Sequence, residues 1–113
     1  MKGKSKKRKA RTASQQRWLD AVAEGGSILS GMKPVIIHHL WGETAQAKID
    51  LVTENVGQEA ILPLTEQEHH NLEREENRRP IEKVLFKRLV DRLHDHPDRP
   101  SEAHIKAIME YHR

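Results

Sequence analysis

The stretch "AILPLTEQEHH", residues 60–70, joins a short aliphatic run directly to a polar segment with two adjacent histidines. Apolar runs of this length are typical of short strands, and Pro63 places this one at the edge or the end of a sheet. Thr65 is followed three residues later by Glu68, which is the capping-box pattern of a helix start. The sequence therefore predicts a strand that passes straight into a helix, whose first turns carry His69.

A second histidine pair ends another apolar run, "VIIHHLWG", at residues 35–42. Its β-branched residues predict a strand that ends near His38 and His39. Adjacent side chains of a strand point to opposite faces, so both imidazoles serve one site only if the strand ends or twists there. His69, at the fourth position of the predicted helix, leans back toward the incoming strand, whereas the neighbouring His70 points elsewhere.

Two interpretations of these histidines are open from the residues alone. They are either hydrogen-bonded histidines of a core or a sheet edge, or neutral imidazoles that meet at the strand end and the helix start to bind a divalent metal ion. Glu73, four residues after His69, shares its helix face and is a candidate third ligand. A further histidine beside such an ion can deprotonate a water for attack on phosphorus.

Flanking segments add helices on both sides of these strands. A helix follows Ser14 and is ended by the glycines at 25 and 26. "GSILSG", residues 26–31, and "KPVIIHHL", residues 33–40, suit two short strands or one strand and its approach. Residues 41–59 form a long polar connection. Two C-terminal helices are expected in 80–96 and 101–112, with Ser101 as a cap and with these apolar faces: Ile81, Val84, Leu85, Leu89 and Leu93 in the first, and Ile105, Ile108 and Met109 in the second.

Composition bounds the class of protein. The chain has 113 residues, which suits one α+β domain with a single modest core. It has no cysteine, which excludes disulfides, thiolate zinc sites and cysteine nucleophiles. No apolar run approaches the roughly 20 residues of a membrane span, and the basic start lacks the apolar segment of a secretory signal. We therefore expect a soluble, cytoplasmic protein without a membrane partner.

Positive charge is concentrated at the start of the chain. Seven of the 20 basic residues lie in "MKGKSKKRKAR", so the other 102 residues hold 13 basic against 17 acidic side chains. Such a segment is expected to be disordered over residues 1–13 and to bind the phosphates of DNA in a salt-dependent way. A solubilising or localisation tail is the alternative. The candidate nucleic-acid-binding residues are Lys2, Lys4, Lys6, Lys7, Arg8, Lys9 and Arg11.

Together, "HHLWG" and "ILPLTEQEH" resemble the core of HNH, or ββα-metal, nucleases, and most closely the phage recombination-enhancement nucleases of the Ref type. Members of that family combine a basic amino-terminal region, a helix, a short turn ahead of "IHH", and an "IPL" run with a histidine five residues after its leucine. Here His69 stands five residues after Leu64. The resemblance covers about half of the chain, residues 17–71.

The resemblance implies a ββα-metal core with flanking helices in a domain spanning residues 14–113, with a helical extension from about residue 80. It implies a metal-dependent DNA endonuclease in which His38 and His69 bind the ion and His39 is the general base. Mg²⁺ or Mn²⁺ is the expected cofactor, with Zn²⁺ as a further possibility. If the resemblance extends to partners, a RecA-type recombinase filament and a role in phage recombination in the host cytoplasm follow.

Departures from the family pattern leave alternatives open. Many relatives carry cysteine pairs for a structural zinc where this chain has Ser27, Ser30 and Thr65, so no structural zinc is expected. Ala60 stands where many relatives have an asparagine that orients the base. Either a backbone carbonyl or one of three nearby side chains replaces it, or the chain is an inactive, degenerate copy that binds nucleic acid or regulates a partner through its C-terminal helix pair. The three side chains are Asn55, Gln58 and Glu59.

Overall fold

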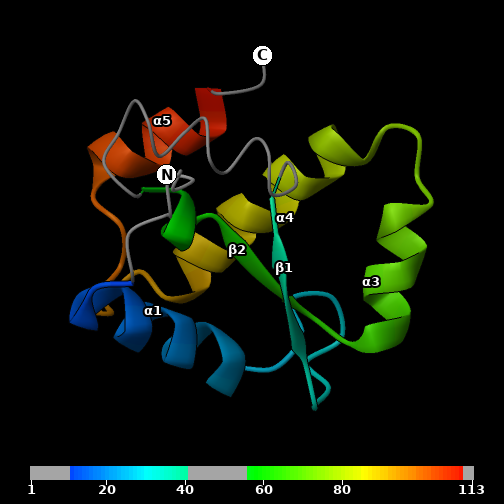
Figure 1. Cartoon of the computed structure of the whole chain (residues 1–113), viewed down its shortest axis with the longest axis horizontal. Helices are drawn as coiled ribbons and strands as arrows, with labels where there is room; N and C mark the ends of the chain where they lie inside the picture. The colour runs from blue at the N-terminus through cyan, green and yellow to red at the C-terminus, as the bar shows by residue number, and fades with distance from the viewer. Residues whose placement is uncertain (1–10, 41–55, 111–113) are drawn as a thin grey trace, which may run out of the picture.

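The computed structural model describes residues 11–40 and 56–110. Within these ranges the protein is α+β, with four α-helices, a short 3-10 helix and two β-strands (Figure 1). Several parts of the sequence discussed above lie outside these ranges: residues 2–9, Trp41, Asn55, His112 and most of the expected connection 41–59. In chain order the elements are α1 (Ala13–Glu24), β1 (Ile36–His39), η1 (Val56–Glu59), β2 (Ile61–Leu64), α3 (Glu66–Glu73), α4 (Arg78–Arg92) and α5 (Glu102–Glu110).

The two strands pair in an antiparallel sheet, with β1 beside β2. His38 lies opposite Leu62, and His39 lies opposite Ile61. One further backbone hydrogen bond, from the Leu40 N–H to the Ala60 carbonyl at 3.0 Å, continues the ladder beyond the strand end. The strand expected before "TEQEH" is thus confirmed, and the helix α3 follows it with only Thr65 between them.

Residues 26–31 contain a turn and no strand, so of the two expected arrangements the structure has one strand, β1, and its approach. The Ser27 hydroxyl accepts hydrogen bonds from the backbone N–H groups of Leu29 and Ser30, at 2.9 and 3.0 Å. Gly26 and Gly31 both have φ near +77°, a conformation that glycine adopts without strain. Side-chain bonding to a local turn has therefore replaced strand pairing here.

The helices α1 and α3 both begin with a capping box. In α3, the Thr65 hydroxyl accepts from the Glu68 N–H at 3.2 Å and the Glu68 carboxylate accepts from the Thr65 N–H at 2.9 Å, as the sequence predicts. In α1 the same box forms between Thr12 and Gln15. Ser14 lies inside α1, so the expectation that it precedes the helix is wrong by two residues, because a threonine and a glutamine upstream satisfy the first N–H groups.

A single hydrophobic core surrounds β2, whose four residues are all buried. The helices α1 and α4 pack against β2, and α3 contacts both strands (Figure 1). Trp18 of α1 is fully buried and donates its indole N–H to the Glu59 carbonyl at 3.3 Å. The core also contains Val22, Leu40, Ala60, Ile61, Leu62, Leu64, Leu72, Leu85, Phe86, Leu89, Val90 and Ile108.

The buried face of α4 differs from the expected one. Ile81 and Val84 were expected to be buried but are 37% and 53% exposed. Instead, the buried face of the helix includes one acidic residue, Glu82, among its apolar residues. Leu85 and Leu89 are buried as expected, and Leu93 packs partly buried against the core. Glu82 lies one helical turn before Phe86, so the rotation that buries the Phe86 ring also buries Glu82. Burial of the large aromatic ring thus outweighs burial of the Ile81 and Val84 side chains.

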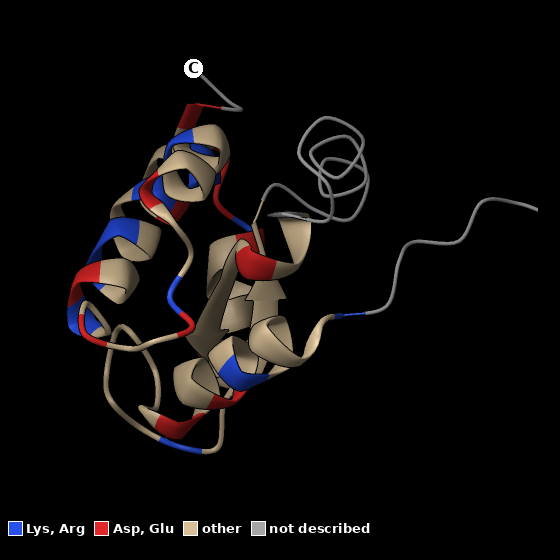
Figure 2. Cartoon of the chain, turned by 90° about the vertical axis from the view of Figure 1, so that its left-hand side faces the viewer, with Lys and Arg blue, Asp and Glu red and all other residues tan. Residues whose placement is uncertain are grey.

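The last helix, α5, follows its expected pattern. The Ser101 hydroxyl accepts from the His104 N–H at 3.1 Å, which caps the helix. Ile108 is fully buried, and Ile105 and Met109 pack partly buried against the same core. The Lys, Arg, Asp and Glu side chains of the described elements lie on the helices and η1, and the two strands carry none of them (Figure 2). Among the described residues, no helix has the length and apolar character needed to cross a membrane.

Candidate metal site

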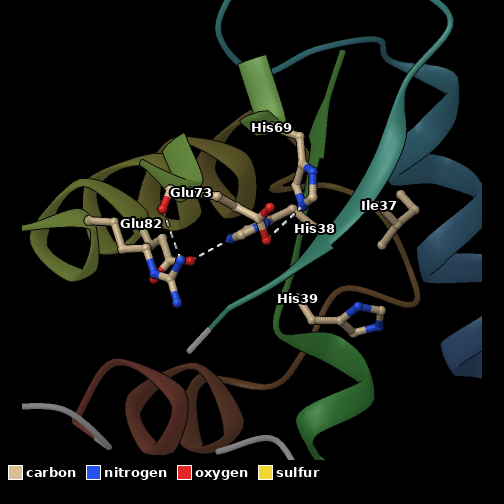
Figure 3. Close-up of a pocket in the computed structure, with 7 residues that line it drawn as sticks. Ile37, His38, His39, His69, Glu73 and Glu82 are labelled. Carbon is tan, nitrogen blue, oxygen red and sulfur yellow. Dashed lines mark hydrogen bonds and ion pairs between the residues drawn. The ribbon is translucent and has the colours of Figure 1, made fainter. Parts of the chain in front are cut away.

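Strand alternation separates the two histidines of β1. His38 is 5% exposed and points to the side of the sheet where α3 and α4 lie (Figure 3). His39 is half-buried, and its ring points away from His38 and its neighbours (Figure 3). Both residues border one cavity of about 300 Å³. The sequence expectation that only one of them can face the strand-helix junction, unless the strand twists, therefore describes the observed arrangement.

The cap of α3 determines where His69 lies. Because Thr65 is the N-cap, His69 is one turn into the helix and its side chain leans back over β1. Its ring meets that of His38 edge to face, with centroids 5.1 Å apart and planes at 65°. His70 is exposed, and its Nε2 lies 4.0 Å from a Glu66 carboxylate oxygen on the outer face of the helix.

Glu73 completes a group of three ligand-type side chains. It lies one turn after His69, and its carboxylate is 3.5 Å from the His69 Nε2. One ligand atom from each of His38, His69 and Glu73 can be chosen so that all three lie within 4.8 Å of one another. Ligand atoms held about 2.1 Å from one ion in a tetrahedral arrangement lie about 3.4 Å from one another, so the longest of these separations would have to shorten by up to about 1.4 Å on metal binding.

The electrostatics of the group suit metal binding. Burial lowers the pKa of the His69 imidazole below its usual value, and the neighbouring His38 and Arg78 act in the same direction against the opposing carboxylate of Glu73. An imidazole binds a metal ion only when it is neutral, so a lowered pKa keeps His69 available at neutral pH. Two imidazoles and one carboxylate are also a ligand set of known catalytic zinc sites.

No protein-family model, curated protein or solved structure matched the chain.

Two residues that the sequence analysis did not single out line the same cavity, Arg78 and Glu82. Arg78, in the first turn of α4, donates to the Glu73 backbone carbonyl at 3.5 Å. Glu82 is 1% exposed and one of its carboxylate oxygens is hydrogen-bonded to the His38 Nε2. A sequence signal for Glu82 exists, because it stands three, four and seven residues before buried apolar residues of α4, which places it on the buried face.

Gln58 and Glu59, two of the side chains considered for orienting the general base, are hydrogen-bonded to other residues. Glu59 accepts from the Gln15 amide at 3.3 Å, and its other oxygen lies 2.9 Å from the His104 Nδ1. Gln58 accepts from the Arg11 guanidinium at 3.3 Å. Ala60 provides only a backbone carbonyl, which bonds to the Leu40 N–H beyond the end of β1.

Two further histidines of the described residues lie outside the site. His94 is exposed at the end of α4, and His96 contacts the edge of Trp18 at a centroid distance of 6.3 Å. The Ser27 hydroxyl, where the sequence predicts no structural zinc, donates to Glu68 at 2.6 Å. Arg11, the described member of the basic segment, also donates to Gln16 at 3.0 Å.

Proposed function

We propose that this protein is a metal-dependent DNA endonuclease with a ββα-metal, or HNH, core. The observation that carries the proposal is the meeting of His38, from a strand, with His69 and Glu73, from the helix that follows the paired strand. The order of a strand, a second strand and a capped helix is the order that the proposed core requires. The sequence resemblance described above supports the same conclusion.

The three ligand-type side chains would hold the ion. The two imidazoles favour Zn²⁺ over Mg²⁺, and the carboxylate also suits Mn²⁺ or Mg²⁺. When bound, the ion supplies positive charge that stabilises the extra negative charge on the scissile phosphate. The protein holds these ligands in place from two elements, since β1 carries His38 and α3 carries His69 and Glu73. Arg78, which borders the same cavity, is placed to pair with a second phosphate oxygen.

His39 is the proposed general base. It would accept a proton from a water molecule while the water oxygen bonds to phosphorus and the bond from phosphorus to the leaving sugar oxygen breaks. His39 borders the cavity from the side of β1 opposite to His38, so the phosphodiester would pass around the end of that strand. The basic residues at the start of the chain would hold the DNA through its phosphates without reading its sequence.

The experiment is nicking of a supercoiled plasmid in Mg²⁺, Mn²⁺ or Zn²⁺, with and without DNA held in a RecA-type recombinase filament. We expect cleavage by the unaltered protein, at least a hundredfold less by His39→Ala, and none by His38→Ala. His94→Ala, which removes an exposed histidine far from the cavity, should cleave normally. Equal cleavage by the unaltered protein and His39→Ala would remove His39 from the mechanism, and no cleavage in any arm would reject the nuclease.

Non-enzymatic nucleic-acid binding is the second candidate, and a specific observation favours it. The ring of His39 points away from the ligand group, and the described candidates for orienting it, Gln58 and Glu59, bond to other partners. In that case the protein would bind DNA with a steep salt dependence and leave every plasmid intact in all metal and filament conditions.

A further inference from the structure

Glu82 is a carboxylate in an unusual place. It lies in the second turn of α4 and is 1% exposed, on the same helix face as Leu85, Phe86 and Leu89. One of its carboxylate oxygens, Oε2, bonds to the His38 Nε2. The other, Oε1, is buried without a hydrogen-bond partner among the described residues. Burying a carboxylate is costly, and an apolar residue of similar size would serve the core better, so packing alone does not account for it.

The partner of Glu82 suggests its role. His38 is the one residue of the proposed ligand group that comes from β1. Its Nε2 is hydrogen-bonded to Glu82, and its ring contacts the ring of His69. A histidine that binds a metal through one nitrogen commonly donates its other N–H to a carboxylate, which fixes both the ring orientation and the position of the proton. Because Nε2 faces Glu82, Nδ1 is the nitrogen left for an ion.

We propose that Glu82 is the positioning residue of the metal site: it accepts the Nε2 proton of His38 and thereby presents the Nδ1 lone pair to the ion. The inference rests on the metal site of the proposed function and deepens it by assigning a role to a residue of α4, outside the strands and α3. The buried Glu82 then couples the packing of α4 to the geometry of the site, because the helix can shift only if this hydrogen bond is broken.

A direct ligand role for Glu82 fits the contacts less well. The Oε2 atom is already paired with the His38 Nε2, so an ion bound by that oxygen would displace the proton between them. His38, His69 and Glu73 also form a three-ligand group without Glu82. The positioning role and the ligand role predict opposite fates for the Nε2 proton when metal binds, which makes them separable by experiment.

The first test is proton–nitrogen NMR of the ¹⁵N-labelled protein at about pH 8, with Zn²⁺ alone as the probe. We expect a downfield, slowly exchanging imidazole N–H signal from His38, assigned by its loss in His38→Gln. This signal should persist and shift when Zn²⁺ is added, and it should be lost in Glu82→Leu. Absence of the signal in the unaltered protein, or its disappearance on Zn²⁺ binding, overturns the proposal.

The second test is Zn²⁺ affinity measured by calorimetry on the full chain. Loss of a carboxylate that orients a ligand typically lowers metal affinity 10- to 100-fold, which we expect for Glu82→Leu. Glu82→Gln should lose about tenfold or less, because the amide oxygen still accepts the N–H, and this isosteric change also serves if Glu82→Leu fails to fold. The matched control is Glu59→Gln, which alters another buried glutamate paired with a histidine and should leave Zn²⁺ affinity unchanged.

Each outcome decides between roles. If Glu82→Gln weakens Zn²⁺ binding as much as His38→Ala does, Glu82 is a ligand and the positioning role is wrong. If both Glu82 variants bind Zn²⁺ like the unaltered protein, Glu82 serves folding only. Neither test measures cleavage, so a protein that binds Zn²⁺ as expected but leaves DNA intact would reject the nuclease while keeping the role of Glu82.

Discussion

Single residues in this protein act through the neighbours that the fold brings to them. His69 and His70 are adjacent in the chain and share one helix, yet His69 meets His38 while His70 lies exposed beside Glu66. The difference comes from the rotation of about 100° between successive helical positions. The same helix therefore carries a candidate ligand on one face and an ordinary surface histidine on the next.

This contrast allows a matched pair of variants. His69→Ala should reduce affinity for Zn²⁺ or Mn²⁺ at least a hundredfold, since it removes one of the three proposed ligands. His70→Ala should leave the affinity unchanged, because the side chain is exposed and faces away from the group. Calorimetric titration of both variants measures the difference. Equal loss of affinity in the two variants would contradict the assignment of His69.

At the scale of elements, the junction between β2 and α3 positions the site. Thr65 follows the last residue of β2 and is the N-cap of α3. The Ser27 hydroxyl, from the turn before β1, donates to Glu68 of the same capping box. The turn, the strand and the helix thus share one set of hydrogen bonds. Loss of the cap should loosen the first turn of α3, which carries His69.

Thr65→Ala should lower the free energy of unfolding by about 1 kcal/mol, the usual cost of losing an N-cap side chain. It should also weaken Zn²⁺ binding measurably, because His69 lies in the turn that the cap stabilises. Gln67→Ala is the control, since it replaces an exposed residue of the same turn by a strong helix former. Urea denaturation gives the stability, and a Thr65→Ala protein as stable as the control would show that the cap contributes little.

For the whole molecule, polar contacts attach the C-terminal segment to the first helix. Asp98, between α4 and α5, accepts from the Arg17 guanidinium at 2.9 and 3.0 Å and from the Ser14 hydroxyl at 2.9 Å. Glu59 similarly connects α1 and α5 through Gln15 and His104. These contacts hold the two ends of the described chain against the core that surrounds β2.

The hydrogen bond from Arg17 lowers the pKa of Asp98 below its usual value, with a smaller contribution in the same direction from Ser14. Because the pKa is lower in the folded state than in the unfolded state, the stabilisation is present above the ordinary aspartate pKa of about 3.9 and is lost as the pH falls through the lower folded value. Asp98→Asn should therefore reduce stability at pH 7 and lose less on acidification. Thermal unfolding from pH 7 to pH 2 measures this, with Asp91→Asn, an exposed aspartate, as the control.

The basic segment is also a property of the whole molecule. Deleting residues 2–10 removes six of its seven basic residues and keeps Arg11, which bonds to the folded body. DNA affinity should fall, and the dependence of its logarithm on log salt should flatten by about 0.9 for each phosphate that the shortened chain no longer neutralises. Fluorescence anisotropy at several salt concentrations checks this. An unchanged salt slope in a variant with unchanged melting temperature would show that DNA binds elsewhere.

Local chemistry determined most of the elements from the sequence alone. The Thr65–Glu68 capping box, the short strand before it and the helix capped by Ser101 each depend on residues within a few positions of one another, and all three are confirmed. The placement of His69 and Glu73 on one face of α3 also follows from local rules, because the cap sets the helix phase. The approach of His38 to them depends on the pairing of β1 with β2. The family, the DNA substrate and the reaction stay predictions.

Tertiary structure decided what local rules leave open. The rotation of α4 buries Glu82 and exposes Ile81 and Val84. Both faces of the helix carry apolar residues at helical spacing, and the packing that buries Phe86 in the core selects the one with Glu82. Ser27 and the glycines around it could pair as a strand or close a turn, and contacts with Glu68, 41 residues away, select the turn. The pairing of Glu82 with His38 spans 44 residues and exists only because the core brings α4 behind β1.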